Sequence, residues 1–237
     1  MNPLLLIAAL LPAIILLVRV YRLDQIEKEP PRVLLKLLAF GALSGLIAAV
    51  AEEALTRVLD LCFRYRSVVY IAIENFVIVA GVEETCKRFP VRKYLWNDPA
   101  FNYRFDAVVY CVFSALGFAA LENVFYVAQY GFGTALVRAL LSVPGHCFFA
   151  VYMGVYLGEA KQAERCGNLV RRETFLRYSL LVPMLLHGFW DFCLSFESTI
   201  MTILFYVFVV LFFLHANRLL RISAQTDEPL GGGWNNF

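Results

Sequence analysis

Long apolar stretches of the sequence carry ionisable side chains of the kinds that perform acid–base chemistry. The six candidates are Glu83, Glu84, Glu122, His146, His187 and Asp191. A charged group at the centre of a membrane helix costs about 2.5–3.5 kcal/mol on insertion scales. Such groups must therefore face one another or water, and converging carboxylates and imidazoles are the material of general acid–base catalysis or of a metal site.

The spacing of His187 and Asp191 is the most specific of these signals. Four residues separate them, which places both on one face of a helix, so the carboxylate can fix the tautomer and orientation of the imidazole. His146 follows a Pro144-Gly145 pair, which weakens a helix and lets another backbone approach. Each of these residues, and Glu122, could instead make an ordinary polar contact between helices.

Glu83 and Glu84 are adjacent and point about 100° apart on a helix. They cannot both face one cavity equally. Lys87 lies four residues after Glu83, and Arg88 lies four residues after Glu84, as ion-pair partners. We therefore expect one glutamate to be paired structurally and the other to act, and the sequence leaves open which is which.

Other ionisable residues are expected to lie on solvated surfaces. Glu52 and Glu53, with Arg57 four residues after Glu53, sit where the second apolar stretch leaves the membrane. His215 lies beside polar residues at the end of the last stretch and is also interpreted as a surface residue. Glu74 remains undecided.

The composition defines the elements that position these groups. The chain has 237 residues, of which 60% are hydrophobic and only 17% charged, which excludes a soluble single-core domain and intrinsic disorder. A net charge of +2 without a basic tract argues against nucleic acid as a partner. Six cysteines without paired spacing indicate neither a disulfide framework nor a cysteine metal site. Seven apolar segments approach bilayer length, at about residues 3–18, 33–51, 67–86, 106–128, 134–157, 177–196 and 198–217.

We predict an all-α, polytopic integral membrane protein with about seven transmembrane helices around a polar intramembrane cavity. Residues 1–221 form its single domain, and residues 222–237 a disordered cytoplasmic tail. To bring the glutamates to the depth of His187, the third helix must continue past Lys87 to about Lys93, with a kink at Pro90. Lys87 and Arg88 would then be intramembrane partners of the glutamates.

Basic residues predict the orientation. Of the 21 Lys and Arg residues, 17 fall in alternate connecting segments and the tail, and 4 fall on the other side. By the positive-inside rule, the N-terminus lies outside and the C-terminus in the cytoplasm of a cell-membrane protein.

The order of the motifs resembles a known family. Glu83-Glu84-x-x-Lys87, then Phe118-x-x-x-Glu122-Asn123, then Gly145-His146 and His187-x-x-x-Asp191 resemble the motifs of the PrsW intramembrane proteases. The segment 24–30 is similar to the family's stretch after its first helix. The wider superfamily includes the CAAX prenyl endopeptidases and the Aph subunit of gamma-secretase.

The resemblance implies a peptidase that cleaves membrane-anchored protein substrates, with anti-sigma factors as the family's known example, in a lipid bilayer and without a soluble cofactor. It makes Glu83 or Glu84 the general base. Glu122 and His146 would help to hold the water, and His187, held by Asp191, would stabilise the oxyanion. The cofactor stays open between Zn²⁺ and none, with Glu83 or Glu84, Glu122, His146 and His187 as the metal ligands in the first case.

Two other functions compete with proteolysis. A non-catalytic membrane scaffold or chaperone, as the Aph relative is thought to be, would use the same polar groups to hold helices together. A proton-coupled transporter would also need intramembrane carboxylates and histidines, together with repeats or broken helices. The order of the motifs favours the protease.

Overall fold

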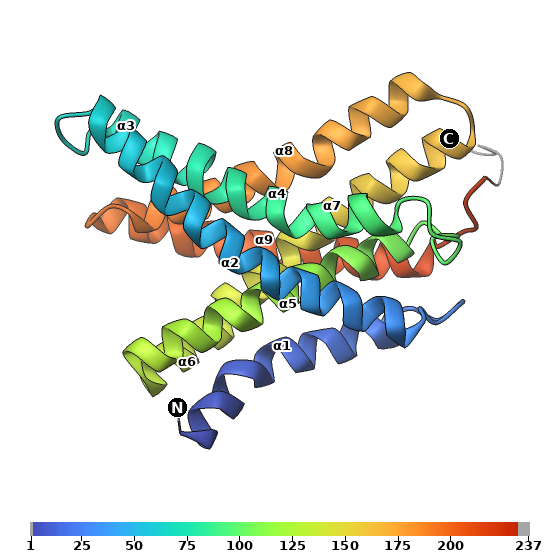
Figure 1. The fold of residues 1–237 in the computed structure, drawn as a ribbon, viewed down its shortest axis with the longest axis horizontal. Coiled ribbons are helices and arrows are strands. Elements are labelled where there is room, and N and C mark those ends of the chain that lie inside the picture. The colour runs from blue at the N-terminus through green and yellow to red at the C-terminus, as the bar shows by residue number, and fades with distance from the viewer. Residues whose placement is uncertain (1, 232–237) are drawn as a thin grey trace.

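A computed structural model describes residues 2–231, and these form an all-helical membrane protein, as the sequence predicts (Figure 1). No β-strand occurs in this range, where Tyr103 and Pro229 form an isolated bridge. Seven continuous helical segments follow one another between residues 2 and 231. They comprise α1 (Pro3–Leu23), α2 (Pro31–Cys62), the run α3 (Val68–Ala72), η1 (Ile73–Val79), α4 (Ala80–Pro90) and η2 (Val91–Leu95), α5 (Asp106–Tyr130), α6 (Phe132–Leu140) with α7 (Ser142–Arg165), α8 (Leu169–Leu194) and α9 (Thr199–Gln225).

Five of these segments are long and apolar enough to cross a membrane. They are α1, α2, α5, the pair α6–α7, and α9. The other two, residues 68–95 and α8, carry the two adjacent glutamates and the His187–Asp191 pair. The two helices that supply these groups are thus less apolar than the other five. Their charged side chains must face protein or water, because a charge exposed to lipid is costly.

The third helical segment extends beyond its apolar stretch, as the depth argument predicts. The helix runs through Lys87 to Pro90 and continues as the π-helical segment η2 to Leu95. Lys87 is fully buried. A second π-helical segment, η1, precedes α4. Such segments are rare and are frequent at functional sites.

Helix α5 forms the centre of the bundle, and every residue from 105 to 119 is buried. Small residues let its neighbours approach closely. A Cβ at Gly117 would lie 2.3 Å from the carbonyl oxygen of Leu38 on α2. A Cβ at Gly154 of α7 would lie 2.4 Å from the Cα of Val108. Helices α2 and α7 therefore hold α5 at backbone distance, which fixes the depth of the side chains that α5 and α7 contribute.

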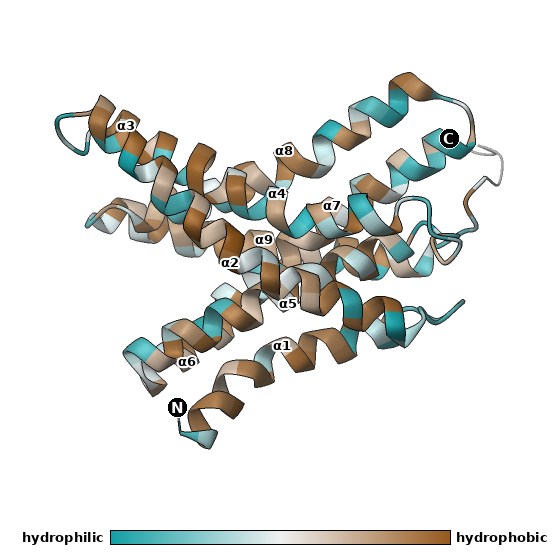
Figure 2. Cartoon of the chain, viewed as in Figure 1, coloured by the Kyte–Doolittle hydropathy of each residue, from teal (hydrophilic) through white to brown (hydrophobic). Residues whose placement is uncertain are grey.

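The two ends of the bundle differ in polarity. Hydrophilic residues concentrate at the right-hand end in Figure 2, where the connections 24–30, 96–105 and 166–168 and the C-terminal end of α9 lie. These connections and the helix ends that flank them carry most of the basic residues. The assignment of this end to the cytoplasm stays a prediction from the positive-inside rule.

The predicted disordered tail needs correction. Helix α9 continues to Gln225, and the residues after it pack on the 100–105 loop. The Asp227 carboxylate accepts a hydrogen bond from the Phe105 amide at 2.8 Å, and the amide of Leu230 donates to the Asn102 carbonyl at 2.7 Å. Glycines and polar residues in this segment suggested disorder, but tertiary contacts outweigh that local preference. Residues 232–237 lie outside the described residues.

Candidate active site

The ammonium group of Lys87 lies at the centre of the candidate site. It donates to Glu83 Oε2 at 2.8 Å and to Glu84 Oε1 at 2.7 Å, and its third contact is His146 Nδ1 at 2.9 Å. The ring of Phe118 lies 4.7 Å from the same nitrogen. A buried ammonium is tolerated only when its donors are satisfied by charged or polar partners. Lys87 thus links the two glutamates of α4 to the histidine of α7.

The contacts of His146 define its tautomer. Its Nδ1 faces the Lys87 ammonium, which can only donate, so Nδ1 must accept. Its Nε2 lies 3.0 Å from Glu122 Oε2, which can only accept when ionised, so Nε2 carries the proton. Glu122 also pairs with Arg138 Nη2 at 2.8 Å. His146 is therefore a neutral imidazole held between a cation and a carboxylate.

His187 has a carboxylate at each ring nitrogen. Its Nδ1 lies 2.9 Å from Glu84 Oε1, and its Nε2 lies 3.2 Å from Asp191 Oδ2, at the four-residue spacing that the sequence indicated. Glu83 Oε2 is 3.9 Å from the same Nε2. Two ionised acceptors at the two nitrogens require two donors, which makes the ring an imidazolium. The site thus places one neutral and one charged imidazole with their ring centroids 5.6 Å apart.

The helix that carries His146 begins differently from what the sequence indicated. The break between α6 and α7 lies at Leu141, and Pro144 occupies the first turn of α7, where proline is tolerated. Gly145 faces the side chain of Trp190 rather than another backbone. The close approach occurs instead at Gly188, next to His187, where a Cβ would lie 2.8 Å from the Cα of Phe76.

A cavity of about 860 Å³ opens beside these groups. Glu83, Glu122, His146, His187 and Asp191 all line it. Glu84 does not line the cavity, and its side chain is fully buried. The two adjacent glutamates therefore differ as the 100° offset requires, with Glu83 facing the cavity and Glu84 facing the protein interior.

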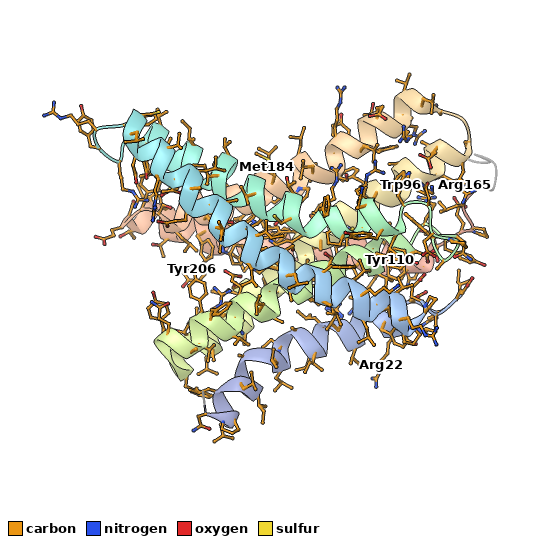
Figure 3. All side chains as sticks on the ribbon, in the orientation of Figure 1. Arg22, Trp96, Tyr110, Arg165, Met184 and Tyr206 are labelled. Atoms are coloured by element: carbon orange, nitrogen blue, oxygen red, sulfur yellow. The ribbon has the colours of Figure 1, made fainter. Side chains whose placement is uncertain are left out.

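Apolar and aromatic residues from several helices form the rest of the cavity wall. Leu46 and Ala49 come from α2, and Val137 comes from α6. Tyr206 of α9, which Figure 3 labels, belongs to the same wall. On the inner side, Phe149 stacks on the His187 ring at a centroid distance of 4.9 Å. This wall gives an extended apolar segment a surface on which to lie beside the polar groups.

Two expectations about individual residues were wrong. Arg88 does not pair with Glu84 but donates to the carbonyl of Leu176 at 2.9 Å. Glu53 pairs with Arg57 on an exposed face, as expected, but Glu52 turns the other way and lines the cavity. Helix α2 continues past both glutamates to Cys62.

Three further ionisable residues are Glu74, His215 and Arg138, and the structure shows a contact for each. Glu74, which the sequence left undecided, pairs with Arg66 away from the cavity. His215 is exposed, as expected, and stacks on Tyr152. Arg138, one of the four basic residues on the predicted outer side, is the ion-pair partner of Glu122. Its position within an apolar stretch was the signal that could have identified it.

Three side chains of the site could together bind a metal ion. Glu83, Glu84 and His146 each offer a ligand atom, and these atoms lie within 4.8 Å of one another. Carboxylate oxygen and imidazole nitrogen suit Zn²⁺, and Glu84 Oε2 is buried without a hydrogen-bond partner among the described residues. These three side chains fit a metal ion. Glu122 and His187, the other two expected ligands, lie outside this group of three, so their role as ligands stays a prediction.

Comparison with known proteins gives one consistent result. The model of the PrsW family of intramembrane metalloproteases matches residues 29–216. The chain belongs to this family of intramembrane proteases. It is 32% identical to Protease PrsW of Clostridioides difficile over 86% of this chain and 84% of that protein. It is 34% identical to Protease PrsW of Geobacillus kaustophilus, over 79% and 78% of the two chains. No solved structure matches it significantly.

Membership of the PrsW family makes the protein a peptidase that acts on protein substrates in a membrane. It favours proteolysis over the scaffold and the transporter considered from the sequence. The family's description as metalloproteases agrees with the donor set of Glu83, Glu84 and His146. The Lys87 ammonium bonds to the same three side chains, so a metal ion and this ammonium compete for them.

Proposed function

We propose that this PrsW-family protease hydrolyses a peptide bond with a water molecule activated by Glu83. The observation that carries this proposal is that Glu83 both bonds to Lys87 and lines the cavity, whereas Glu84 bonds to Lys87 from a fully buried position. A general base must reach the proton that it abstracts. Glu84 instead positions two other groups, Lys87 and His187.

The proton follows a short path in this mechanism. Water in the cavity gives a proton to the Glu83 carboxylate as its oxygen attacks the carbonyl carbon of the substrate. Negative charge develops on the carbonyl oxygen, and the His187 imidazolium beside the cavity stabilises it. Glu83 then gives its proton to the leaving amine nitrogen as the C–N bond breaks. Asp191 orients the imidazolium, and Glu122 holds His146 against the Lys87 ammonium that pairs with Glu83.

A metal ion bound by Glu83, Glu84 and His146 would act as a Lewis acid on the carbonyl and would lower the pKa of a bound water. The roles of the surrounding residues do not depend on it. His187 and Asp191 still supply positive charge and orientation, and Arg138 still holds Glu122. Glu122 in turn fixes the His146 tautomer that leaves Nδ1 as an acceptor or ligand.

The proposed substrate is a membrane-anchored protein whose chain enters the cavity in an extended form. The apolar wall beside a row of polar groups fits a segment that leaves the bilayer and unwinds. An anti-sigma factor with a single membrane-spanning helix is the specific substrate that the resemblance suggests.

Cleavage of a membrane-anchored substrate by purified protein in detergent tests the base. Glu83→Gln keeps size and hydrogen bonding but removes basicity, so we expect cleavage to fall by about 10²–10⁴-fold while the protein still folds. Glu84→Gln should lower thermal stability more than activity. The matched control is Glu53→Gln, which removes an exposed glutamate from α2.

Full activity of well-folded Glu83→Gln protein would reject Glu83 as the base. A parallel assay with a zinc chelator separates the two cofactor hypotheses. Loss of cleavage that added Zn²⁺ restores would assign the water to a metal, and unchanged cleavage would assign it to the carboxylate alone.

A further inference from the structure

A second polar cavity lies between α1 and α9 and shares no lining residue with the cavity of the candidate active site. Its volume is about 640 Å³. Its basic residues are Arg19 of α1 and Arg218 and Arg221 of α9, and its apolar residues include Leu214 and Ile222. The α9 residues recur at three- and four-residue intervals, so they form one continuous face of the helix.

The three arginines have no acidic partner among residues 2–231. Arg19 Nη2 donates to Asn217 Oδ1 at 2.6 Å, which links α1 to α9 but leaves the charge uncompensated. No carboxylate of the described chain forms an ion pair with Arg19, Arg218 or Arg221. Three guanidinium groups around one cavity repel one another unless an anion lies between them.

Only some arginines of the described chain have acidic partners. Arg104 pairs with Glu159 and Glu228, and Arg172 pairs with Glu164. What distinguishes the three cavity arginines is that they line one cavity together, whereas Arg22 and Arg32, which also form no ion pair among the described residues, lie outside it.

The surroundings of the cavity indicate the kind of anion. Helices α1 and α9 are the least buried of the membrane-spanning helices, with 17% and 22% of their most apolar windows inside the protein. Ile15 and Val18 of α1 and Leu211 of α9 are exposed on the apolar side of the arginines. A ligand here meets guanidinium groups at one end and an exposed hydrocarbon surface along the helices.

We propose that this cavity binds the phosphate-bearing headgroup of an anionic phospholipid, whose acyl chains lie along α1 and α9. Guanidinium groups bind phosphate through two parallel hydrogen bonds, and basic pockets between membrane helices bind anionic headgroups. Bound lipid would supply the missing counter-charge and join α1 to α9. It would also support the catalytic side of the bundle, because Phe212 of α9 stacks on Phe149, which stacks on His187.

Thermal unfolding of the full chain in a neutral detergent measures this binding without any substrate. Phosphatidylglycerol is the probe, and phosphatidylcholine is the zwitterionic control. The test variant is Arg218→Gln with Arg221→Gln. Its matched control is Arg22→Gln with Arg32→Gln, which removes two exposed positive charges outside the cavity. Figure 3 shows Arg22 at the end of α1.

We expect phosphatidylglycerol to stabilise the natural chain and the control variant, and the phosphatidylglycerol concentration for half-maximal stabilisation to rise at least tenfold in the test variant. Equal stabilisation of test and control variants would show non-specific charge attraction and overturn the proposal. Inorganic phosphate that protects as well as phosphatidylglycerol would assign the cavity to a soluble anion instead. If the double variant does not fold, Arg221→Gln alone against Arg32→Gln gives the same comparison. Unfolding is read without cleavage, so failure of this site and failure of the Glu83 mechanism are distinguishable.

Discussion

Two clusters of buried carboxylates can be compared among residues 2–231, and of these two the cluster around Lys87 opens to a cavity. The loop cluster consists of Glu29, Asp106 and Tyr110, at the polar end of the bundle. Asp106 Oδ2 accepts from the backbone amides of Asn102 and Tyr103, at 2.9 and 2.7 Å, and the Tyr110 hydroxyl donates to Glu29. Apart from each other, the two carboxyl groups of the loop cluster thus have backbone amides and a phenol as partners.

The cavity cluster consists of the groups around Lys87, and the hydrogen-bond partners of its carboxylates are titratable side chains. Glu83 and Glu84 bond to an ammonium, and Glu84 also bonds to a histidine. The difference between the two clusters shows that burial alone does not identify a carboxylate as catalytic. What distinguishes the cavity cluster is the combination of titratable partners with space for a substrate.

Among the variants that compare the two clusters, those at His187 and Asp191 should lower activity most, and they separate the charge in the cavity from its orientation. His187→Ala removes the imidazolium and should lower kcat by about 10²–10³-fold, the cost typical of losing one oxyanion-stabilising group. Asp191→Asn leaves the ring in place and should lower kcat less. Cleavage kinetics of both variants in detergent provide the measurement. Equal losses would show that Asp191 does more than orient the ring. The control from the loop cluster is Tyr110→Phe, which should keep its kcat.

The next effect concerns stability. Lys87→Met leaves Glu83 and Glu84 buried without their shared cation, so unfolding should become easier by about 3–5 kcal/mol, the cost of breaking a buried ion pair by removing one partner. Thermal unfolding in detergent measures the change. If zinc added to this variant restores its stability, the metal and the ammonium occupy the same donors. A variant as stable as the natural chain would contradict the central position of Lys87.

A smaller effect is expected at the edge of the cavity. Glu52 lines the cavity without an ion-pair partner among the described side chains. Glu52→Gln should lower kcat/KM less than tenfold for substrates with a basic residue near the cleaved bond, because a partly solvated charge contributes about 1 kcal/mol or less. Glu53→Gln, one position away on the exposed face, should change nothing. An effect of equal size in both variants would place Glu52 on the outer surface, as the sequence first suggested.

The loop cluster is expected to have the smallest effect on kcat, and its effect on stability depends on pH. Burial raises the pKa of Glu29 from 4.5 to about 9, with the Asp106 charge adding to the shift. A carboxyl whose pKa is higher in the folded state favours folding most when protonated, so its contribution is complete below pH 4.5 and is lost as the pH rises through about 9. Thermal unfolding across this range should show that decline. Glu29→Gln should flatten it without changing kcat, and a decline of unchanged slope would assign the effect to other groups.

The sequence alone was sufficient to predict the membrane helices and the ionisable candidates for the site. Apolar segments of bilayer length can form only helices in this composition, because lipid leaves the backbone no other hydrogen-bond partner. The cost of a charge in a membrane then marks Glu83, Glu122, His146 and His187 without any knowledge of their neighbours. The i,i+4 contact of His187 with Asp191 follows from helix geometry in the same way.

Contacts between helices could not be predicted in this way. Spacing gives the angle between Glu83 and Glu84, but only the crossing of α4 with α7 and α8 decides that Glu83 faces the cavity and that Lys87 bonds to His146. The same holds for Arg138, whose partner Glu122 lies on another helix. The 3.6-residue repeat fixes directions within one helix, whereas partners on different helices depend on close approaches at residues such as Gly117 and on how far each helix has slid past its neighbour.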